Sequence, residues 1–386
     1  TTTNGTCTGS TMTDRIPEIF DSTDINDLKN DLSKTYNGFN VDVNNLSVSS
    51  MPSIASAPSP TCVCTVSGTF NLNTSTNSCT GVADFTACGG QVKFSGGDVK
   101  IYGIPATIST LVSTGNITTD THLSATTGNF TNKSFYALGT SNITFNDSSI
   151  TLNNSTIVSG GGITLSDFNT AVNSTKIVSE GTSGVTISSG TSIENSAIVS
   201  TNTSGNISLG GVAYTNSTIV SKNTLTLEST AGAITDSAIF TKNLYLEKPG
   251  ANVAGGILYA SNNATTQSPF SGNKTIGTTV KPILFFVGGD LSVNHGAGSA
   301  DIIGLTFVNG NINLNDSVGG FTLTGAVIAN GTSGTNTVSM SGNSQITFNK
   351  SILSALSSSL SGIVKSPTCG GSGQGIYMSN NKVTIY

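Results

Sequence analysis

Cysteines are the residues of this sequence whose type and spacing most directly indicate chemistry. The chain has six: Cys7, Cys62, Cys64, Cys79, Cys88 and Cys369. Five of them lie in the first quarter, and an even, clustered set in a chain with few charged residues is typical of disulfides in an oxidising, extracytoplasmic compartment. A zinc site is the alternative, but zinc thiolates are normally paired two to four residues apart, and one residue separates Cys62 from Cys64. We therefore predict disulfides, with the pairing left open among the 15 that six cysteines allow.

Groups suited to cleaving a polysaccharide are scattered along the chain. Such chemistry needs paired carboxylates, or basic residues beside aromatic rings. The acidic residues between 92 and 350 form no Asp-Asp or Glu-x-Glu pair, the chain has no Trp, and its two histidines, His122 and His295, lie far apart. The Gly288-Gly289-Asp290 segment resembles a tight turn rather than a phosphate-binding loop, because no Gly-Lys-Ser/Thr sequence follows it. We expect no enzymatic activity, no metal and no cofactor.

The composition excludes several classes of partner. Charged residues make up 9% of the 386 residues and the net charge is -5, without a basic run; binding to nucleic acid depends on clustered cations, so none is expected. No stretch of about 18 apolar residues is present, so no membrane span is expected in this chain. Thr1 follows no apolar leader, which is compatible with earlier removal of an upstream segment. A hydrophobic content of 35% is enough for a folded protein.

Internal repetition is the strongest signal in the sequence. Five segments share the pattern Asn-Ser-x-Ile-Val-Ser or a close variant, and they begin at Asn154, Asn173, Asn195, Asn216 and Asp236. Their first residues are 19, 22, 21 and 20 positions apart, a period in the range of solenoid proteins. Each is followed by a second alternating triplet, such as Ile163-Thr-Leu165. Weaker copies extend the periodic region to residues 92–350, which is on the order of a dozen repeats.

The alternation within each triplet indicates how the repeats fold. Ile163 and Leu165 face one side of a strand and Thr164 faces the other, while Gly, Asn, Asp and Ser fill the turns. A unit of about 20 residues cannot bury its own apolar face, so the units must stack. A leucine-rich repeat would need a Leu-x-x-Leu-x-Leu frame, which is missing. We therefore predict an all-β protein, a parallel β-solenoid (β-helix) of about 20-residue coils.

Two polar columns follow from this stacking. Asn154, Asn173, Asn195, Asn216 and Asp236 should lie above one another at a corner, as a ladder of side-chain hydrogen bonds rather than a calcium site, because only one of them is acidic. Thr164, Thr186, Ser208 and Thr226 should form an outward hydroxyl column. We favour a solvated face that prevents aggregation; binding of polysaccharide, ice or a neighbouring subunit is the alternative.

The flanks differ from the repeats. Residues 1–91 are expected to form a cysteine-rich cap or arm with a short amphipathic helix, because Ile25, Leu28 and Leu32 recur at helical spacing. Residues 351–386 are expected to form a C-terminal cap, with a short helix over 352–360 and a last strand over 382–386.

Part of the periodic region resembles a known family. The segments Lys281–Val293, Ile303–Leu314, Leu323–Thr332 and Ile346–Leu356 are similar to the C-terminal part of PilX-like proteins associated with type IV pili. In that group a β-solenoid ectodomain follows a pilin-type helix. The Asn-Ser-x-Ile-Val-Ser array also resembles adhesins of the filamentous haemagglutinin type.

Both resemblances imply a structural or adhesive protein of the cell surface, located outside the cell, such as a subunit of a filament or pilus. Filament neighbours or other copies of the chain are then the expected partners, with surface polysaccharide as a further one. The terminal strand Val383, Thr384, Ile385 and Tyr386 is a candidate assembly strand that would add to a neighbour's open edge. A β-helix protein that binds or cleaves carbohydrate is the alternative function.

Overall fold

The computed structural model describes residues 22–124, 126–228, 230–247, 253–266, 274–295, 300–316, 320–329, 338–349, 351–352, 355–356, 376–379 and 382–385. The fold is all-β, with 5% helix, and is a parallel β-solenoid of about 11 turns with coils of about 21 residues. This confirms the fold class predicted from the repeats.

The chain divides into two compact units: unit 2 holds residues 35–41 and 46–252, and unit 1 holds residues 1–34, 42–45 and 253–386.

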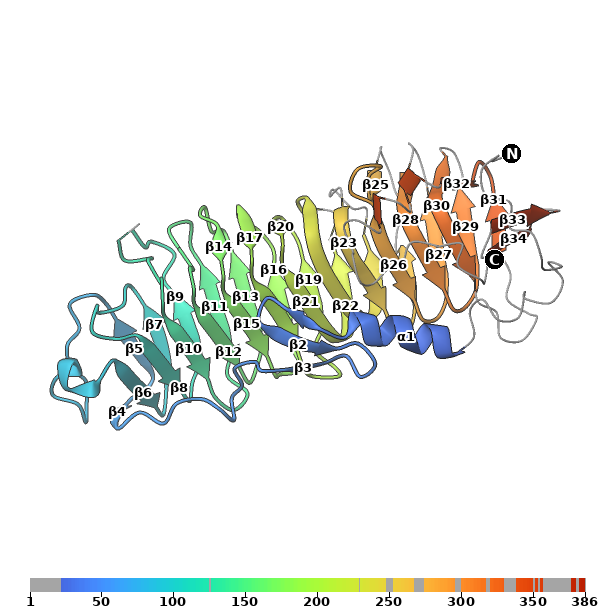
Figure 1. Cartoon of the computed structure of the whole chain (residues 1–386). Coiled ribbons are helices and arrows are strands. Elements are labelled where there is room, and N and C mark those ends of the chain that lie inside the picture. The colour runs from blue at the N-terminus through green and yellow to red at the C-terminus, as the bar shows by residue number, and fades with distance from the viewer. Residues whose placement is uncertain are drawn as a thin grey trace. The chain divides into compact units, whose positions relative to one another are not determined.

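Unit 2 contains most of the coils, in each of which a first strand, a second strand and in places a third follow one another (Figure 1). Its solenoid strands are β4 (Cys62–Thr65), β5 (Thr69–Leu72), β6 (Gln91–Ser95), β7 (Asp98–Ile101), β8 (Thr110–Ser113), β9 (Ile117–Thr119), β10 (Ser134–Ala137), β11 (Ile143–Asn146), β12 (Thr156–Ser159), β13 (Ile163–Ser166), β14 (Val172–Asn173), β15 (Lys176–Ser179), β16 (Val185–Ile187), β17 (Ser192–Glu194), β18 (Ala197–Ser200), β19 (Ile207–Leu209), β20 (Ala213–Thr215), β21 (Thr218–Leu227) and β22 (Ile234–Leu246).

Equivalent strands of successive coils pair in parallel and in register. Ile157 of β12 lies beside Ile177 of β15, and Ile163 of β13 beside Val185 of β16. The pairing already begins at β4, whose Cys62 lies beside Val92 of β6. The cysteine-rich segment after the Pro/Ser stretch therefore contributes one coil, β4 and β5, upstream of the boundary expected at residue 92.

The core of unit 2 is a stack of side chains repeated once per coil. The inward column of the first strands is Val92, Leu111, Phe135, Ile157, Ile177, Ile198, Ile219 and Ile239, each at most 1% exposed. The second strands contribute a matching column that includes Ile163, Val185, Ile207 and Leu225. Burying one such side chain stabilises the folded chain by about 1.5–3 kcal/mol. Like residues stack because the register brings the same repeat position above itself at each turn.

Unit 1 has the same construction. Its strands are β23 (Val253–Ala260), β24 (Ala264–Thr266), β25 (Lys274–Ile276), β26 (Ile283–Val287), β27 (Leu291–His295), β28 (Ala300–Val308), β29 (Ile312–Asp316), β30 (Phe321–Ala329), β31 (Val338–Ser341), β32 (Gln345–Phe348), β33 (Ile376–Ser379) and β34 (Lys382–Ile385). From β23 to β32 the pairing is parallel, as between β28 and β30. β33 and β34 form a separate antiparallel pair.

The predicted helices are found where the structure describes them. α1 (Ser22–Leu32) is the expected amphipathic helix, and its Leu32 is fully buried in unit 1. Residues 351, 352, 355 and 356 are helical, within the range expected for the C-terminal helix. Asn349 accepts a backbone hydrogen bond from Ile352 at the start of this turn.

Between α1 and β4 the chain forms a small antiparallel sheet of β1 (Thr35–Tyr36), β2 (Phe39–Asp42) and β3 (Ser47–Ser49). We call residues 35–41 and 46–61 the N-terminal arm. Within unit 2 the arm lies on the outer face of the first strands, where β2 and β3 are seen in front of the solenoid (Figure 1).

Candidate functional site

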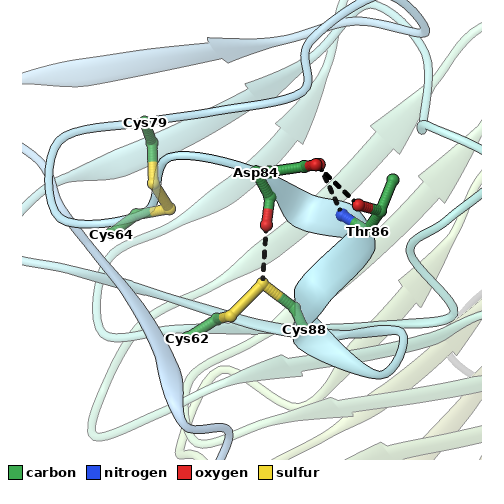
Figure 2. The surroundings of a disulfide bond; sticks show 6 residues. All are labelled: Cys62, Cys64, Cys79, Asp84, Thr86 and Cys88. Carbon is green, nitrogen blue, oxygen red and sulfur yellow. Dashed lines mark hydrogen bonds between the residues drawn. A yellow bond between two sulfur atoms is a disulfide. The ribbon is translucent and has the colours of Figure 1, made fainter.

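Four of the six cysteines form two disulfides at the start of the solenoid. Cys62 is bonded to Cys88 and Cys64 to Cys79 (Figure 2). Cys62 and Cys64 lie on the same strand, β4, and because one residue separates them they point to the same side of it. Both bonds therefore tie the segment 73–90 to β4. Cys7 and Cys369 lie outside the described residues.

The stapled segment closes the N-terminal edge of unit 2. It ends in the 3₁₀-helix η2 (Phe85–Cys88), whose N-cap is Asp84: its carboxylate accepts hydrogen bonds from the Thr86 backbone amide and hydroxyl (Figure 2). Phe85 is 1% exposed and its ring lies edge-on to Phe94 of β6, with 6.5 Å between ring centres. The Thr65 amide donates to the Thr80 carbonyl. The segment thus covers the first apolar side chains of the core.

The repeated asparagines lie at a corner of the coil, as their spacing predicts. Asn154, Asn195, Asn216 and Asp236 have φ between 46° and 50°, a left-handed conformation that Asn and Asp adopt more readily than most residues. The Asn195 amide donates to Asn173 Oδ1 at 3.1 Å, and the Asn216 amide donates to Asn195 Oδ1 at 2.7 Å.

The ladder differs in detail from the simple repeat. Asn154 donates to Asn132, one coil earlier and outside the predicted set, at 2.7 Å. In the coil of Asn173 the left-handed residue is Ser174, one position later, and Asn154 is joined to that coil by a backbone bond to the Asn173 carbonyl. The coil has one extra residue before its Ile-Val pair, and this insertion shifts the corner.

A second column of hydroxyl groups, which was not predicted from the sequence, is buried beside the corner. It consists of Ser155, Thr175, Ser196, Ser217 and Ser237, all at most 2% exposed. Each hydroxyl donates a hydrogen bond to a backbone carbonyl of the preceding coil, as Ser217 does to Ile193 at 3.2 Å. Most of these hydroxyls also accept a hydrogen bond from a backbone amide of that coil. The signal was present in the sequence, because a Ser or Thr follows the corner residue in every repeat.

A further column of buried side chains faces outward. The first strands carry Val158, Val178, Val199, Val220 and Phe240 on the side opposite to the core, and all are at most 1% exposed. We call these residues the outer apolar column. The adjacent Ile and Val of each repeat were the available signal, since a strand that is apolar on both faces is covered on both.

The N-terminal arm is the cover. The Tyr36 ring lies 5.1 Å from the Phe240 ring, and the Lys176 ammonium lies 5.3 Å from the centre of the buried Phe39 ring. The Asn37 side chain donates to the Asn216 carbonyl and accepts from the Thr218 hydroxyl. Nearer the start of the solenoid, the Ile54 amide donates to the Glu180 carboxylate at 2.9 Å. Burial raises the pKa of the Tyr36 hydroxyl.

The predicted hydroxyl column is continuous over more coils than expected. In register along β9, β11, β13, β16, β19 and β21 lie Thr118, Thr144, Thr164, Thr186, Ser208 and Thr226, all half-buried, and the column continues to Tyr245. We call these six residues the hydroxyl row. Parallel pairing spaces neighbouring hydroxyls about 4.8 Å apart. The six side chains of the row carry hydroxyl groups and no charge, and the Glu228 carboxylate accepts a hydrogen bond from the Ser208 hydroxyl.

Charged side chains gather at one end of the hydroxyl row. Lys100 lies beside Thr118, and its ammonium is 2.7 Å from Asp120 Oδ2 and 5.0 Å from the centre of the Tyr102 ring. The imidazole of His122, which is largely exposed, lies 3.4 Å from Asp120 Oδ1. The hydrogen bond with Lys100 lowers the pKa of the Asp120 carboxyl, and the same bond raises the pKa of Lys100. Together these four residues combine an aromatic ring with polar side chains, as carbohydrate-binding sites do.

The other acidic residues of the described part of the chain belong to no metal-ligand cluster. Among the residues that the structure describes, no three His, Cys, Asp or Glu side chains come together as a metal site would require. No helix within this described part of the chain is long and apolar enough to cross a membrane.

The candidate assembly strand is part of a hairpin. Val383, Thr384 and Ile385 lie in β34 and pair with β33 through Met378, Tyr377 and Ile376; Tyr386 lies outside the described residues. One edge of the strand is thereby occupied.

Comparison of the chain with protein-family models, with curated proteins and with solved structures finds no significant match.

Proposed function

We propose that this protein is a non-enzymatic structural or adhesive protein of the cell surface, a filament or pilus-associated subunit that works outside the cell. A β-solenoid is compatible with surface adhesins and with carbohydrate-binding β-helix proteins. One observation favours the first class: most of the polar side chains that recur from coil to coil are used to join the coils. The corner asparagines and the buried hydroxyls beside them bond to the neighbouring turn.

The disulfides support an extracytoplasmic location. Cys62–Cys88 and Cys64–Cys79 are structural bonds within one folded unit, and such bonds persist in oxidising compartments, whereas cytosolic thiols are kept reduced. The low content of charged residues on the strands fits a protein whose surface contacts another surface.

Electron microscopy of the native material tests the proposal. We expect fibres or cell-attached rods that antibodies against the solenoid label, and we expect the purified protein to coat a surface such as glass, polystyrene or bacterial cells. Labelling confined to the cytoplasm, or a purified protein that coats none of these surfaces, would contradict it.

Carbohydrate binding is the second candidate, and it rests on the side chains around Tyr102. An exposed aromatic ring beside Lys100 and Asp120, at the end of the hydroxyl row, offers both stacking and hydrogen bonds to a sugar chain. Incubation with a panel of polysaccharides separates the outcomes. Retention on one polysaccharide without released reducing ends supports binding, and released reducing ends would show a cleaving enzyme.

Replacing Tyr102 by Ala tests which surface is used. If Tyr102 is the platform, Tyr102→Ala loses retention on the polysaccharide while Thr182→Ala, at an exposed position in a different coil, keeps it. If both variants are retained equally, the cluster at Tyr102 is not the binding site.

A further inference from the structure

The last described coil of unit 1 leaves core positions uncovered. β31 pairs in parallel with β29, which places Val338 beside Ile312 and Met340 beside Leu314. β32 pairs with β30, which places Ile346 beside Leu323 and Phe348 beside Gly325. Because pairing in register keeps the same face inward, these four side chains continue the inward columns of the solenoid.

Exposure separates this coil from the one before it. Ile312, Leu314 and Leu323 are at most 2% exposed, whereas Val338, Met340 and Phe348 are 44%, 40% and 43% exposed. These three are half of the six large apolar side chains that are exposed among the described residues. We call Val338, Met340, Ile346 and Phe348 the open end.

The backbone of the open end is also unpaired along one edge, as far as the described strands go. β31 pairs with β29 and β32 pairs with β30, and the other edge of each has no partner among the strands that the structure describes. Natural edge strands are usually blunted by a charged residue, a proline or a bulge, because a bare edge pairs with another chain. Residues 338–349 contain neither charge nor proline, and the pairing of both strands is regular.

The first edge of unit 2 has the opposite character. The disulfide-tied segment covers it, with Phe85 against Phe94. If a neighbour stacked its first coil on the open end, the open end would therefore meet a closed cap rather than bare strands. The surface that does match the open end is the open end of a second copy, which is equally apolar. Residues 338–349 carry none of the charges that make up the net charge of -5, so no like charges face each other at this contact.

We propose that the open end is a self-association surface at which two copies of this chain pair through β31 and β32. The contact is isologous, the commonest arrangement in homodimers, with the edges aligned antiparallel about a two-fold axis. The apolar side chains of one copy cover those of the other. The inference deepens the structural role proposed above by naming its partner, and because an isologous contact closes at two copies, a longer filament would need a second contact elsewhere.

Sedimentation and light scattering on the full chain test the proposal. We expect a reversible dimer whose dissociation constant rises at least about tenfold in Met340→Lys and in Phe348→Lys, since a buried charge opposes each copy of itself. Val280→Lys is the matched control, because Val280 is an apolar residue of unit 1 that is 81% exposed away from the open end; its dimer should be unchanged. Circular dichroism establishes that all three variants are folded.

Hydrogen exchange gives a second readout on the unaltered protein. We expect the amides of 338–341 and 345–348 to become more protected as the protein concentration rises. Protection that is the same at every dilution would show that the chain covers its own open end and would overturn the proposal. A monomer at all concentrations, or a dimer that both lysine variants leave intact, would also overturn it. Neither result bears on labelling at the cell surface, so failure here is distinguishable from failure of the proposed function.

Discussion

The ammonium nitrogen of Lys176 lies 5.3 Å from the centre of the Phe39 ring, across the outer face of unit 2. The two residues are far apart in sequence, and their contact joins the N-terminal arm to the solenoid. Phe39 is fully buried, as are the valines of the outer apolar column. The arm is therefore part of the folded unit and not a free extension.

Phe39→Ala should release the arm. Loss of a buried Phe side chain costs about 3–5 kcal/mol, and the cost falls on the arm because the coils keep their own core. We expect rapid cleavage between residues 46 and 61 in limited proteolysis, with the solenoid left intact. Ser49→Ala, at an exposed position of the same arm, is the control and should be cleaved as slowly as the unaltered chain; equal cleavage rates in all three proteins would contradict the assigned cover.

Tyr214→Phe should stabilise the protein. The Tyr214 side chain is fully buried, and its hydroxyl has no hydrogen-bond partner; burial, and secondarily the charge of Glu228, raises its pKa well above the ordinary value. A buried hydroxyl without a partner costs about 1–3 kcal/mol, which the phenyl ring avoids. Denaturant unfolding should show a gain of about 1 kcal/mol, and Tyr245→Phe, at a ring that is only half-buried, should change little. A loss of stability in Tyr214→Phe would mean that a buried water satisfies the hydroxyl.

Asn195 stabilises the corner in two ways, and two variants separate them. Asn195→Gly keeps the left-handed backbone at φ 49° but loses the side-chain bonds to Asn173 and Asn216, at about 1 kcal/mol. Asn195→Ala loses the bonds and also pays about 1 kcal/mol of backbone strain. We expect alanine to be the more destabilising of the two in denaturant unfolding. The reverse order would show that the left-handed conformation carries no cost here.

Removing the Cys64–Cys79 bond should open the N-terminal edge. The bond closes a loop of 15 residues, for which the entropy model gives about 3 kcal/mol of stabilisation. Cys64→Ala together with Cys79→Ala should lower the free energy of unfolding by about this amount and speed amide exchange in the η2 segment. The Cys62–Cys88 bond, left in place, should still be found by peptide mapping. If Cys62 or Cys88 is found bonded to a different cysteine, the correct pairing of these two depends on the Cys64–Cys79 bond.

The Lys100–Asp120 pair predicts a titration. The Asp120 pKa is lower in the folded chain than in the unfolded chain, so the pair favours folding above the unfolded pKa, and this contribution is lost as the pH falls through the folded value. NMR titration should give a low Asp120 pKa that rises towards the ordinary value in Lys100→Met. Since Asp120 is near the surface, added salt should raise it as well. An Asp120 pKa that Lys100→Met leaves unchanged would refute the pairing.

The repeat alone determined the fold of this protein. A common Ile-Val-Ser unit every 20 or so residues cannot bury its apolar face except by stacking, so the parallel solenoid and the inward columns around Ile163 and Leu165 could be predicted. The left-handed corner of Asn195 and Asn216 also follows locally, because the residue type itself favours that conformation. These are short-range consequences, repeated once per coil.

Only the tertiary structure decided what covers the outside and where the solenoid is closed. The contact of Phe39 with Lys176, the pairing of Cys62 with Cys88 rather than with another cysteine, and the exposure of Met340 each depend on which distant segment lies against a given coil. Such contacts carry no period, and one pattern of apolar residues is compatible with several partners. The physical reason is that periodicity specifies the face a side chain points to, while only the folded chain specifies what it meets there.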